Sequence, residues 1–182
     1  MELVSIEKIG GNYIKKYDIT YKNREGGYKT YEVVSREDII DGNTLGKKTN
    51  AVMIVPFVGD KILMSKEFRL AVNKVVYNFP AGLIDEGETI EEAAIRELKE
   101  ETGLEVTKVL KVLPSSYSAI GISDERVAIV FVRAEGEITG SDNVNEEIES
   151  QLYSKEELKN IVENTNNMCS RTQLVALLLV NS

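Results

Sequence analysis

The pattern of hydrophobic and polar positions changes near residue 48. Before it, bulky and polar residues alternate in "NYIKKYDITYKN" and again in "YKTYEVVSR", with "REGG" between them, which is the signature of a β-hairpin. Residues 42–48 ("GNTLGKK") read as a polar linker. From Ala51 the run "AVMIVPFV" is almost continuously apolar, which predicts a buried strand, and "KILMSKEFR" predicts its hairpin partner. The pattern therefore predicts a small β module over residues 1–48 and a second domain over residues 49–182.

A helix is expected to follow the strand "VVYNFPAG". Thr89 is a favourable N-cap, and Glu92, three residues later, is its partner in a capping box. Gly103 is a natural helix terminator, because glycine adopts the left-handed conformation without steric cost. The sequence thus predicts a helix that begins after Thr89 and ends at Gly103.

Further strands and helices are expected in the second half of the chain. Alternating residues predict strands over 106–113 and 127–134. Ser154, with Glu157 three residues later, predicts the start of a helix, and Ser170 opens the last one. A β-rich module followed by mixed strands and helices indicates an α+β sandwich.

Composition narrows the class of protein. Hydrophobic residues make up 42% of the 182 positions and charged residues 29%, which is typical of a soluble globular chain. We find no signal peptide and no apolar run long enough to span a bilayer, so a cytoplasmic protein without membrane contact is expected. The net charge of −8 argues against nucleic-acid binding, which needs clustered basic residues.

The absence of histidine limits the chemistry further. Catalysis by Ser-His or Cys-His pairs and His-ligated zinc are excluded. Cys169 is the only cysteine, so no intrachain disulfide forms; it falls in a segment expected to be helical, and we interpret it as an idle thiol. Acid–base chemistry near neutral pH must then come from carboxylates, Lys, Tyr or metal-bound water.

Acidic residues crowd the C-terminal part of the predicted helix. Glu97 and Glu101 are four residues apart on one helix face, and Glu100 is adjacent to it. Each like-charged pair at this spacing costs roughly 0.2–0.5 kcal/mol, and the negative end of the helix dipole adds to the cost. Arg96 can reach Glu100, which leaves Glu97 and Glu101 unpaired. The residues alone leave two interpretations open: a Mg²⁺ or Mn²⁺ site, or a solvated acidic helix face.

The segment around this helix, residues 82–104, has a recognisable pattern. Its residues "GLIDEGETIEEAAIRELKEETGL" place specified residue types at fixed spacing, namely Gly82, Glu88, Arg96, Glu97, Leu98, Glu100, Glu101, Gly103 and Leu104. This pattern resembles the Nudix box. The resemblance implies an α/β/α sandwich with a mixed β-sheet, preceded here by a small antiparallel β module. It also implies hydrolysis of a phosphoanhydride bond with Mg²⁺ or Mn²⁺ as cofactor.

The resemblance also implies roles for individual residues. The metal ligands would be Ala81 (through its carbonyl), Glu97, Glu100 and Glu101. Of these, Glu100 and Glu101 would also be catalytic. Residues that organise the motif would be Glu88, Arg96 and Gly103.

Flanking residues resemble the ADP-ribose and nucleotide-sugar pyrophosphatase branch of that family. The resemblance rests on "EFRLAVNKVVYNFPAGLIDEGE" upstream and "SYSAIGISDE" downstream. It implies substrate contacts from Arg69, Gly82, Ser118 and Gly121. This branch often carries Ser-Pro-Gly in the downstream loop, where this chain has "SAIG". A surface ion pair with Glu67 is the alternative reading of Arg69.

In that branch the N-terminal sheet helps to form a homodimer and part of the nucleotide site. Four tyrosines are candidates to stack on adenine: Tyr13, Tyr17, Tyr28 and Tyr31. Cross-strand packing is the alternative role for each. The general base is expected in "NVNEEIES", at Glu146 or, as second choice, at Glu147, and an exposed acidic loop without catalytic role is the alternative.

The expected activity is metal-dependent hydrolysis of ADP-ribose, or a related nucleoside diphosphate sugar, to AMP and ribose 5-phosphate. Alternatives within the family are a dinucleotide polyphosphate or a damaged nucleoside triphosphate as substrate. A different class of function is a sensor that binds ADP-ribose without cleaving it. The complete set of acidic box residues favours an enzyme over a sensor.

Overall fold

The structure is a computed structural model that describes residues 1–141, 143, 145 and 147–181. The chain divides into two compact units. Unit 1 consists of Met1–Ala51 and Pro114–Ala128, and unit 2 of Val52–Leu113 and Ile129–Ser182. A segment from beyond the acidic helix therefore belongs with the N-terminal strands. The division into a dimerisation module and a hydrolase domain at residue 48 stays a prediction.

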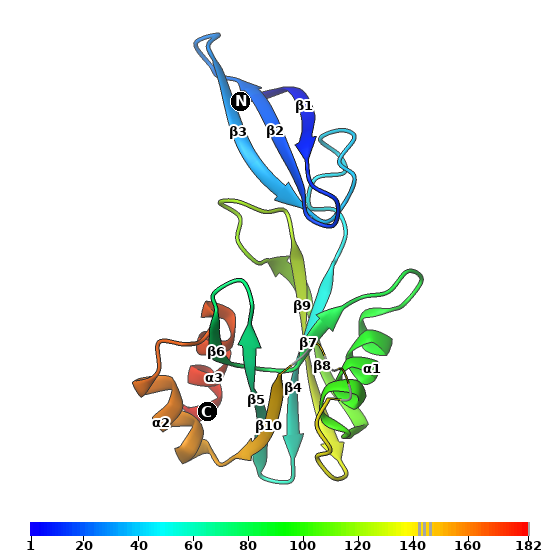
Figure 1. Cartoon of the computed structure of the whole chain (residues 1–182), viewed down its shortest axis with the longest axis vertical. Helices are drawn as coiled ribbons and strands as arrows, with labels where there is room; N and C mark the ends of the chain where they lie inside the picture. The colour runs from blue at the N-terminus through cyan, green and yellow to red at the C-terminus, as the bar shows by residue number, and fades with distance from the viewer. Residues whose placement is uncertain (142, 144, 146, 182) are drawn as a thin grey trace. The chain divides into compact units, whose positions relative to one another are not determined.

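The N-terminal strands of unit 1 form an antiparallel sheet in the order β1-β2-β3 (Figure 1). The predicted hairpin is confirmed as β2 (Lys15–Lys22) and β3 (Tyr28–Ser35). β1 (Glu2–Gly10) pairs with the other edge of β2 and was missed, because its largely exposed side chains lack a strong alternation.

The core of unit 1 lies on one face of this sheet. Tyr17 and Ile19 are buried with Ile39, and Leu45 packs against them. The Tyr17 hydroxyl donates to the Glu37 carbonyl and accepts from the Ile39 amide, each at 3.0 Å. The expected linker is thus partly a packed segment, since its one large apolar residue, Leu45, contacts the sheet.

Unit 2 contains most of a larger sheet, ordered β10-β5-β4-β9-β8, with β6 paired to β5 and β7 paired to β4. The strands are β4 (Ala51–Val58), β5 (Lys61–Arg69), β6 (Lys74–Asn78), β7 (Ala81–Leu83), β8 (Glu105–Tyr117), β9 (Arg126–Glu135) and β10 (Ile148–Tyr153). The expected strands are confirmed, except that "VVYNFPAG" belongs to two strands, β6 and β7, which pair with different neighbours. Strand β10 was not predicted, because "NVNEEIES", which overlaps its start, was interpreted as a loop. It pairs antiparallel with β5 along its whole length.

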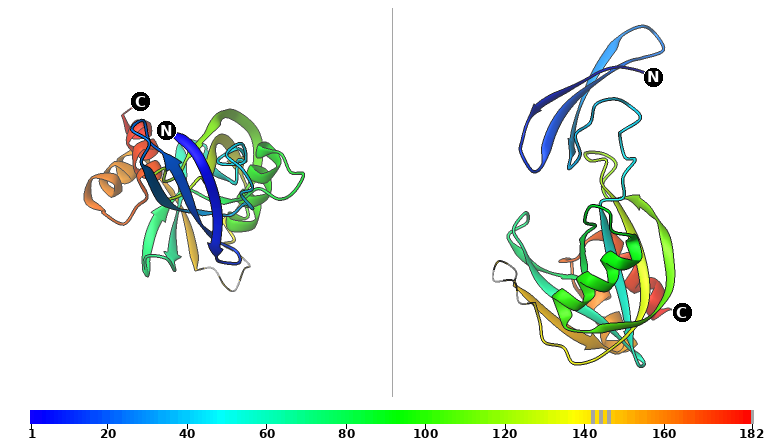
Figure 2. Two further views of the ribbon diagram at one scale, coloured as in Figure 1. Left: turned by 90° about the horizontal axis from the view of Figure 1, so that it is seen from above. Right: turned by 90° about the vertical axis from the view of Figure 1, so that its right-hand side faces the viewer.

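Helices cover both faces of this sheet (Figures 1 and 2). α1 (Ile90–Thr102) lies on one face, and α2 (Lys155–Asn164) and α3 (Ser170–Val180) lie together on the other. The expected α+β sandwich, with a mixed sheet and a separate N-terminal antiparallel sheet, is confirmed. In the part of the chain that the structure describes, no helix is both long and apolar enough to cross a membrane.

The predicted helix starts are also confirmed. Thr89 and Ser154 each accept a hydrogen bond from the amide three residues later, and the glutamate there bonds back to the cap, completing both capping boxes. Gly103 ends α1 in the left-handed conformation, with φ of 79°. Cys169 differs from the expectation: it is the exposed N-cap of α3, with extended backbone angles, and lies outside the helix.

Candidate active site

The acidic face of α1 is directed towards β7. The Ala81 amide donates to Oε2 of Glu101 at 3.3 Å. The Glu97 carboxylate lies against Gly82 so closely that a Cβ at Gly82 would come within 1.9 Å of its Cδ. Glycine is therefore needed at position 82 for the close approach of this carboxylate. These contacts place Glu101 and Glu97 beside two consecutive residues of β7, Ala81 and Gly82 respectively.

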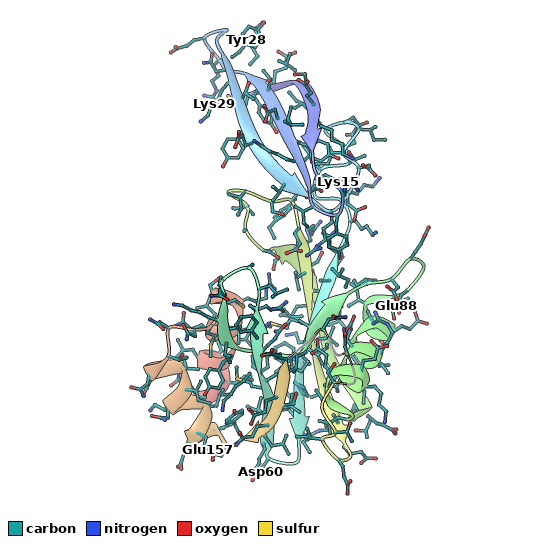
Figure 3. All side chains as sticks on the ribbon, viewed as in Figure 1. Lys15, Tyr28, Lys29, Asp60, Glu88 and Glu157 are labelled. Atoms are coloured by element: carbon teal, nitrogen blue, oxygen red, sulfur yellow. The ribbon has the colours of Figure 1, made fainter. Side chains whose placement is uncertain are left out.

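Arg96 connects the loop before α1 to the helix. Its Nε and Nη2 donate to the two carboxylate oxygens of Glu88 at 2.9 and 2.8 Å, and Nη2 also donates to the Leu83 carbonyl at 2.9 Å. The two parallel hydrogen bonds to Glu88 form the strong bidentate pairing that a guanidinium makes with a carboxylate. Figure 3 shows Glu88 at the base of this loop, next to α1. The expected organising roles of Glu88 and Arg96 are consistent with this geometry.

Arg96 also contacts the acidic helix face. Its Nη1 donates to Oε1 of Glu97 at 2.8 Å and to Oε2 of Glu100 at 3.2 Å. The expectation that Glu97 and Glu101 are unpaired is wrong, because Glu97 shares the guanidinium and Glu101 accepts from Ala81. The side chain of Glu97 is only 14% exposed, whereas that of Glu100 is 60% exposed. The arginine thus offsets part of the repulsion among these carboxylates.

These contacts keep the network charged. Hydrogen bonding from Arg96, with a further hydrogen bond from the Asp85 amide, holds the pKa of the Glu88 carboxyl below its ordinary value of 4.5. The hydrogen bonds to Glu88 and Glu97 raise the pKa of Arg96. The ion pairs that shape the loop are therefore complete at neutral pH.

We predict that Glu88 makes the protein sensitive to acid. Because its pKa is lower in the folded than in the unfolded state, the Arg96 pair stabilises the fold above the unfolded pKa of 4.5 and loses that effect as the pH falls further. In Glu88→Gln, the thermal unfolding midpoint should start lower at neutral pH and fall less in acid. Midpoints measured at several pH values from about 6 down to about 3 check this. Glu86→Gln, at an exposed position in the same loop, is the control, and parallel curves for Glu88→Gln and wild type would contradict the prediction.

The carboxylate oxygens of this site are suitable ligands for a hard divalent cation. Among the described residues, no three acidic side chains gather closely enough to form a metal cluster by themselves. Glu97 and Glu101 nevertheless offer carboxylate oxygens on one side of α1. Mg²⁺ is commonly held by one or two carboxylates together with waters and substrate phosphates. Two carboxylates beside Ala81 and Gly82 therefore fit such an ion.

The predicted site residues outside the box lie in several places. Arg69 is exposed at the end of β5, and its Nε pairs with Oε1 of Glu67 at 3.0 Å, which is the alternative that the sequence left open. Ser118 and Gly121 lie between β8 and β9 and belong to unit 1, whereas the box residues belong to unit 2. Their roles as substrate contacts stay predictions.

The segment expected to carry the general base is described in part. Glu146 lies outside the described residues. Glu147 is exposed, and its carbonyl accepts from the Phe68 amide at 3.0 Å, which continues the pairing of β10 with β5. The backbone at Glu147 is thus held by the sheet, and its role stays a prediction.

The candidate tyrosines have different environments. Tyr17 is buried and serves packing, as described above. Tyr28 is exposed at the hairpin end of β3 (Figure 3). The ring of exposed Tyr13 has the Arg36 guanidinium 5.2 Å from its centroid, and the Tyr31 hydroxyl donates to the Gly121 carbonyl. Sequence reasoning missed Arg36, because its contacts involve residues far along the chain and no local pattern marks them.

Comparison with known proteins supports the assignment of residues 82–104 as a Nudix box. The NUDIX domain family matches residues 47–171. Putative nudix hydrolase 2 of Caenorhabditis elegans is 30% identical over 137 residues, which are 73% of this chain and 60% of that protein. ADP-sugar pyrophosphatase of Mus musculus is 30% identical over 136 residues, 72% of this chain and 60% of that protein. This chain thus spans about 60% of the length of these two relatives.

A solved structure shows the same fold. The crystal structure of an ADP compounds hydrolase superposes with a TM-score of 0.77 at 24% identity, covering 98% of this chain and 91% of that one. The fold of this chain is therefore found in an experimental structure. Since the family match extends over residues 47–171 and includes every acidic position of the box, the chain belongs to the Nudix family.

Proposed function

We propose that this protein hydrolyses the pyrophosphate bond of ADP-ribose, or of a related nucleoside diphosphate sugar, to AMP and ribose 5-phosphate, with Mg²⁺ or Mn²⁺ as cofactor. The observation that carries the proposal is the placement of Glu97 and Glu101 beside Ala81 and Gly82. ADP-sugar pyrophosphatase of mouse and ADP-ribose pyrophosphatase of Saccharomyces cerevisiae, the latter 42% identical over 76 residues, support the substrate class.

The divalent ions, when bound, would neutralise phosphate oxygens and lower the pKa of an attacking water. The residues proposed to hold them are Ala81, Glu97, Glu100 and Glu101. Gly82 lets a carboxylate lie directly against the backbone. Arg96, fixed by Glu88 and the Leu83 carbonyl, sets the shape of the loop in front of α1.

Proton transfer and substrate orientation need further groups. We propose a carboxylate oxygen of Glu146 as acceptor of the proton from water, with Glu147 as the second candidate. Arg69 supplies a cation suited to a phosphate or ribose, on exchange of its present partner Glu67. Ser118 and Gly121 are proposed as further substrate contacts. A homodimer and a cytoplasmic location remain predictions from the sequence.

The proposal is tested by measuring whether the protein hydrolyses ADP-ribose and related compounds. The purified protein is incubated with ADP-ribose and Mg²⁺ or Mn²⁺, and AMP release is measured by chromatography. The same assay with nucleotide sugars, a dinucleotide polyphosphate and an oxidised nucleoside triphosphate ranks the substrates. We expect the highest kcat/KM with ADP-ribose or a nucleotide sugar.

Two outcomes would contradict the proposal. No turnover of ADP-ribose or of any nucleotide sugar removes it. Tight binding of ADP-ribose without product over hours would instead support the alternative function of a sensor.

A further inference from the structure

The buried face of α1 ends in a polar side chain. Ala94, Leu98 and Thr102 recur every four residues along the helix, and each is 0% exposed. The first two are apolar, whereas Thr102 carries a hydroxyl, and threonine is a weaker helix former than alanine or leucine. Valine would fill the same volume without a polar group. Because a buried hydroxyl needs hydrogen-bond partners, its contacts indicate why a polar group stands at this position.

The Thr102 hydroxyl connects the helix to the chain that leaves it. It donates to the Leu98 carbonyl at 2.6 Å and accepts from the buried Leu104 amide at 3.1 Å. The Thr102 carbonyl accepts from the Thr139 amide, in the segment after β9, at 3.0 Å. The last carbonyls of a helix have no partner within the helix, and helix ends fray. These contacts therefore stabilise the end of α1.

The same turn carries a carboxylate of the proposed metal site. Glu101 precedes Thr102 in the last turn of α1 and accepts from the Ala81 amide. Repulsion from Glu97 and the negative end of the helix dipole both favour unwinding of this turn. Unwinding would move the Glu101 carboxylate away from β7, and the hydrogen bonds of Thr102 oppose that movement. All of these residues belong to unit 2.

We propose that Thr102 is a positioning residue for the proposed metal site: its hydroxyl holds the last turn of α1, so that Glu97 and Glu101 keep the places in which they bind the cation. This inference rests on the proposed function. The physical reason is preorganisation, because ligands already held in the binding geometry lose less entropy when the ion binds. Loosening the turn should therefore weaken metal binding and leave the chemical step of the metal-loaded protein nearly unchanged.

The experiment compares two substitutions at Thr102. Thr102→Val replaces the hydroxyl by a methyl group of similar size, whereas Thr102→Ser keeps the hydroxyl. We expect the dissociation constant for Mn²⁺, measured by electron paramagnetic resonance, to rise roughly tenfold in Thr102→Val and to stay within about threefold of wild type in Thr102→Ser. In Thr102→Val the Mg²⁺ concentration for half-maximal hydrolysis of ADP-ribose should rise by a similar factor, with kcat at saturating Mg²⁺ within about threefold of wild type.

Thr172→Val is the matched control for loss of a buried hydroxyl. Thr172 is likewise 0% exposed, and its hydroxyl donates to Oδ1 of Asn78 at 2.6 Å in the first turn of α3. Both valine variants should lower the thermal unfolding midpoint, since each loses a buried hydrogen bond. Thr172→Val should leave the Mn²⁺ affinity unchanged. The comparison thus separates a general loss of stability from a loss of positioning.

Amide hydrogen exchange gives a further readout that needs neither metal nor turnover. Exchange at Leu104 and Thr139 should accelerate in Thr102→Val, because the Leu104 amide loses its acceptor and the helix end loosens. It should not accelerate in Thr102→Ser or Thr172→Val. Should Thr102→Val fail to fold, Thr102→Ser and Thr102→Ala both lack the methyl group and differ only in the hydroxyl, so they allow the same comparison.

Three outcomes would overturn the proposal. Unchanged exchange at Leu104 and Thr139 in Thr102→Val shows that the hydroxyl does not hold the helix end. Accelerated exchange with unchanged Mn²⁺ affinity shows that the helix end does not position the ligands. Equal weakening of Mn²⁺ binding in Thr172→Val shows a general effect of lost stability. If the wild-type protein binds Mn²⁺ but hydrolyses no nucleoside diphosphate compound, the proposed function fails instead, and the Mn²⁺ affinities still decide the role of Thr102.

Discussion

Replacing Glu101 with glutamine is expected to lower kcat/KM for ADP-ribose by roughly a thousandfold. The change removes one negative charge from the proposed metal site. Divalent ions contribute several kcal/mol of charge stabilisation in the transition state, and each 1.36 kcal/mol corresponds to a factor of ten in rate. The side-chain carbonyl of glutamine can still accept the hydrogen bond from the Ala81 amide, so the fold should persist. AMP release and the thermal unfolding midpoint measure the two effects.

A matched substitution on the same helix shows whether activity is lost because any negative charge is removed or because the carboxylate at the proposed metal site is removed. Glu91→Gln removes an equal charge at an exposed position in the first turn of α1. We expect it to retain near wild-type activity. Binding of Mn²⁺, measured by electron paramagnetic resonance, should weaken in Glu101→Gln and not in Glu91→Gln. Activity of Glu101→Gln within tenfold of wild type would refute the role given to this carboxylate.

The second large effect is expected from Gly82→Ala. The added Cβ would lie 1.9 Å from Cδ and 2.0 and 2.2 Å from the two carboxylate oxygens of Glu97. These atoms are the end of a flexible side chain, so the carboxylate moves away and the backbone keeps its course. Displacing a ligand or its support costs roughly 10- to 100-fold in metal affinity or activity. We therefore expect a loss of kcat/KM of that size and a higher Mg²⁺ concentration for half-maximal activity.

Gly10→Ala is the control for adding a methyl group at a glycine. A Cβ at Gly10 would meet no atom within 4 Å, and its φ is not positive. Its activity and Mg²⁺ requirement should match those of the wild-type protein. If Gly82→Ala behaves like Gly10→Ala, the close approach of Glu97 to the backbone has no part in catalysis.

Local sequence signals predicted the parts of this fold that depend on neighbouring residues. The capping boxes at Thr89 and Ser154, and the left-handed end at Gly103, involve residues a few positions apart, so their geometry follows from local chemistry. The hairpin of β2 and β3 follows from alternation and a turn. Strand β10 was not predicted from the sequence, because its pairing with β5 joins residues far apart along the chain.

The sequence by itself determined the family, the box and the acidic face of α1, because these are encoded in residue types at fixed spacing. Only the tertiary structure decided how the charges are shared. Arg96 divides its guanidinium among Glu88, Glu97 and Glu100, and Glu97 lies against Gly82. The tertiary structure also showed that residues 118–125 are hydrogen-bonded to β3. Such contacts depend on where the backbone brings distant groups together, and periodicity along the chain carries no record of that.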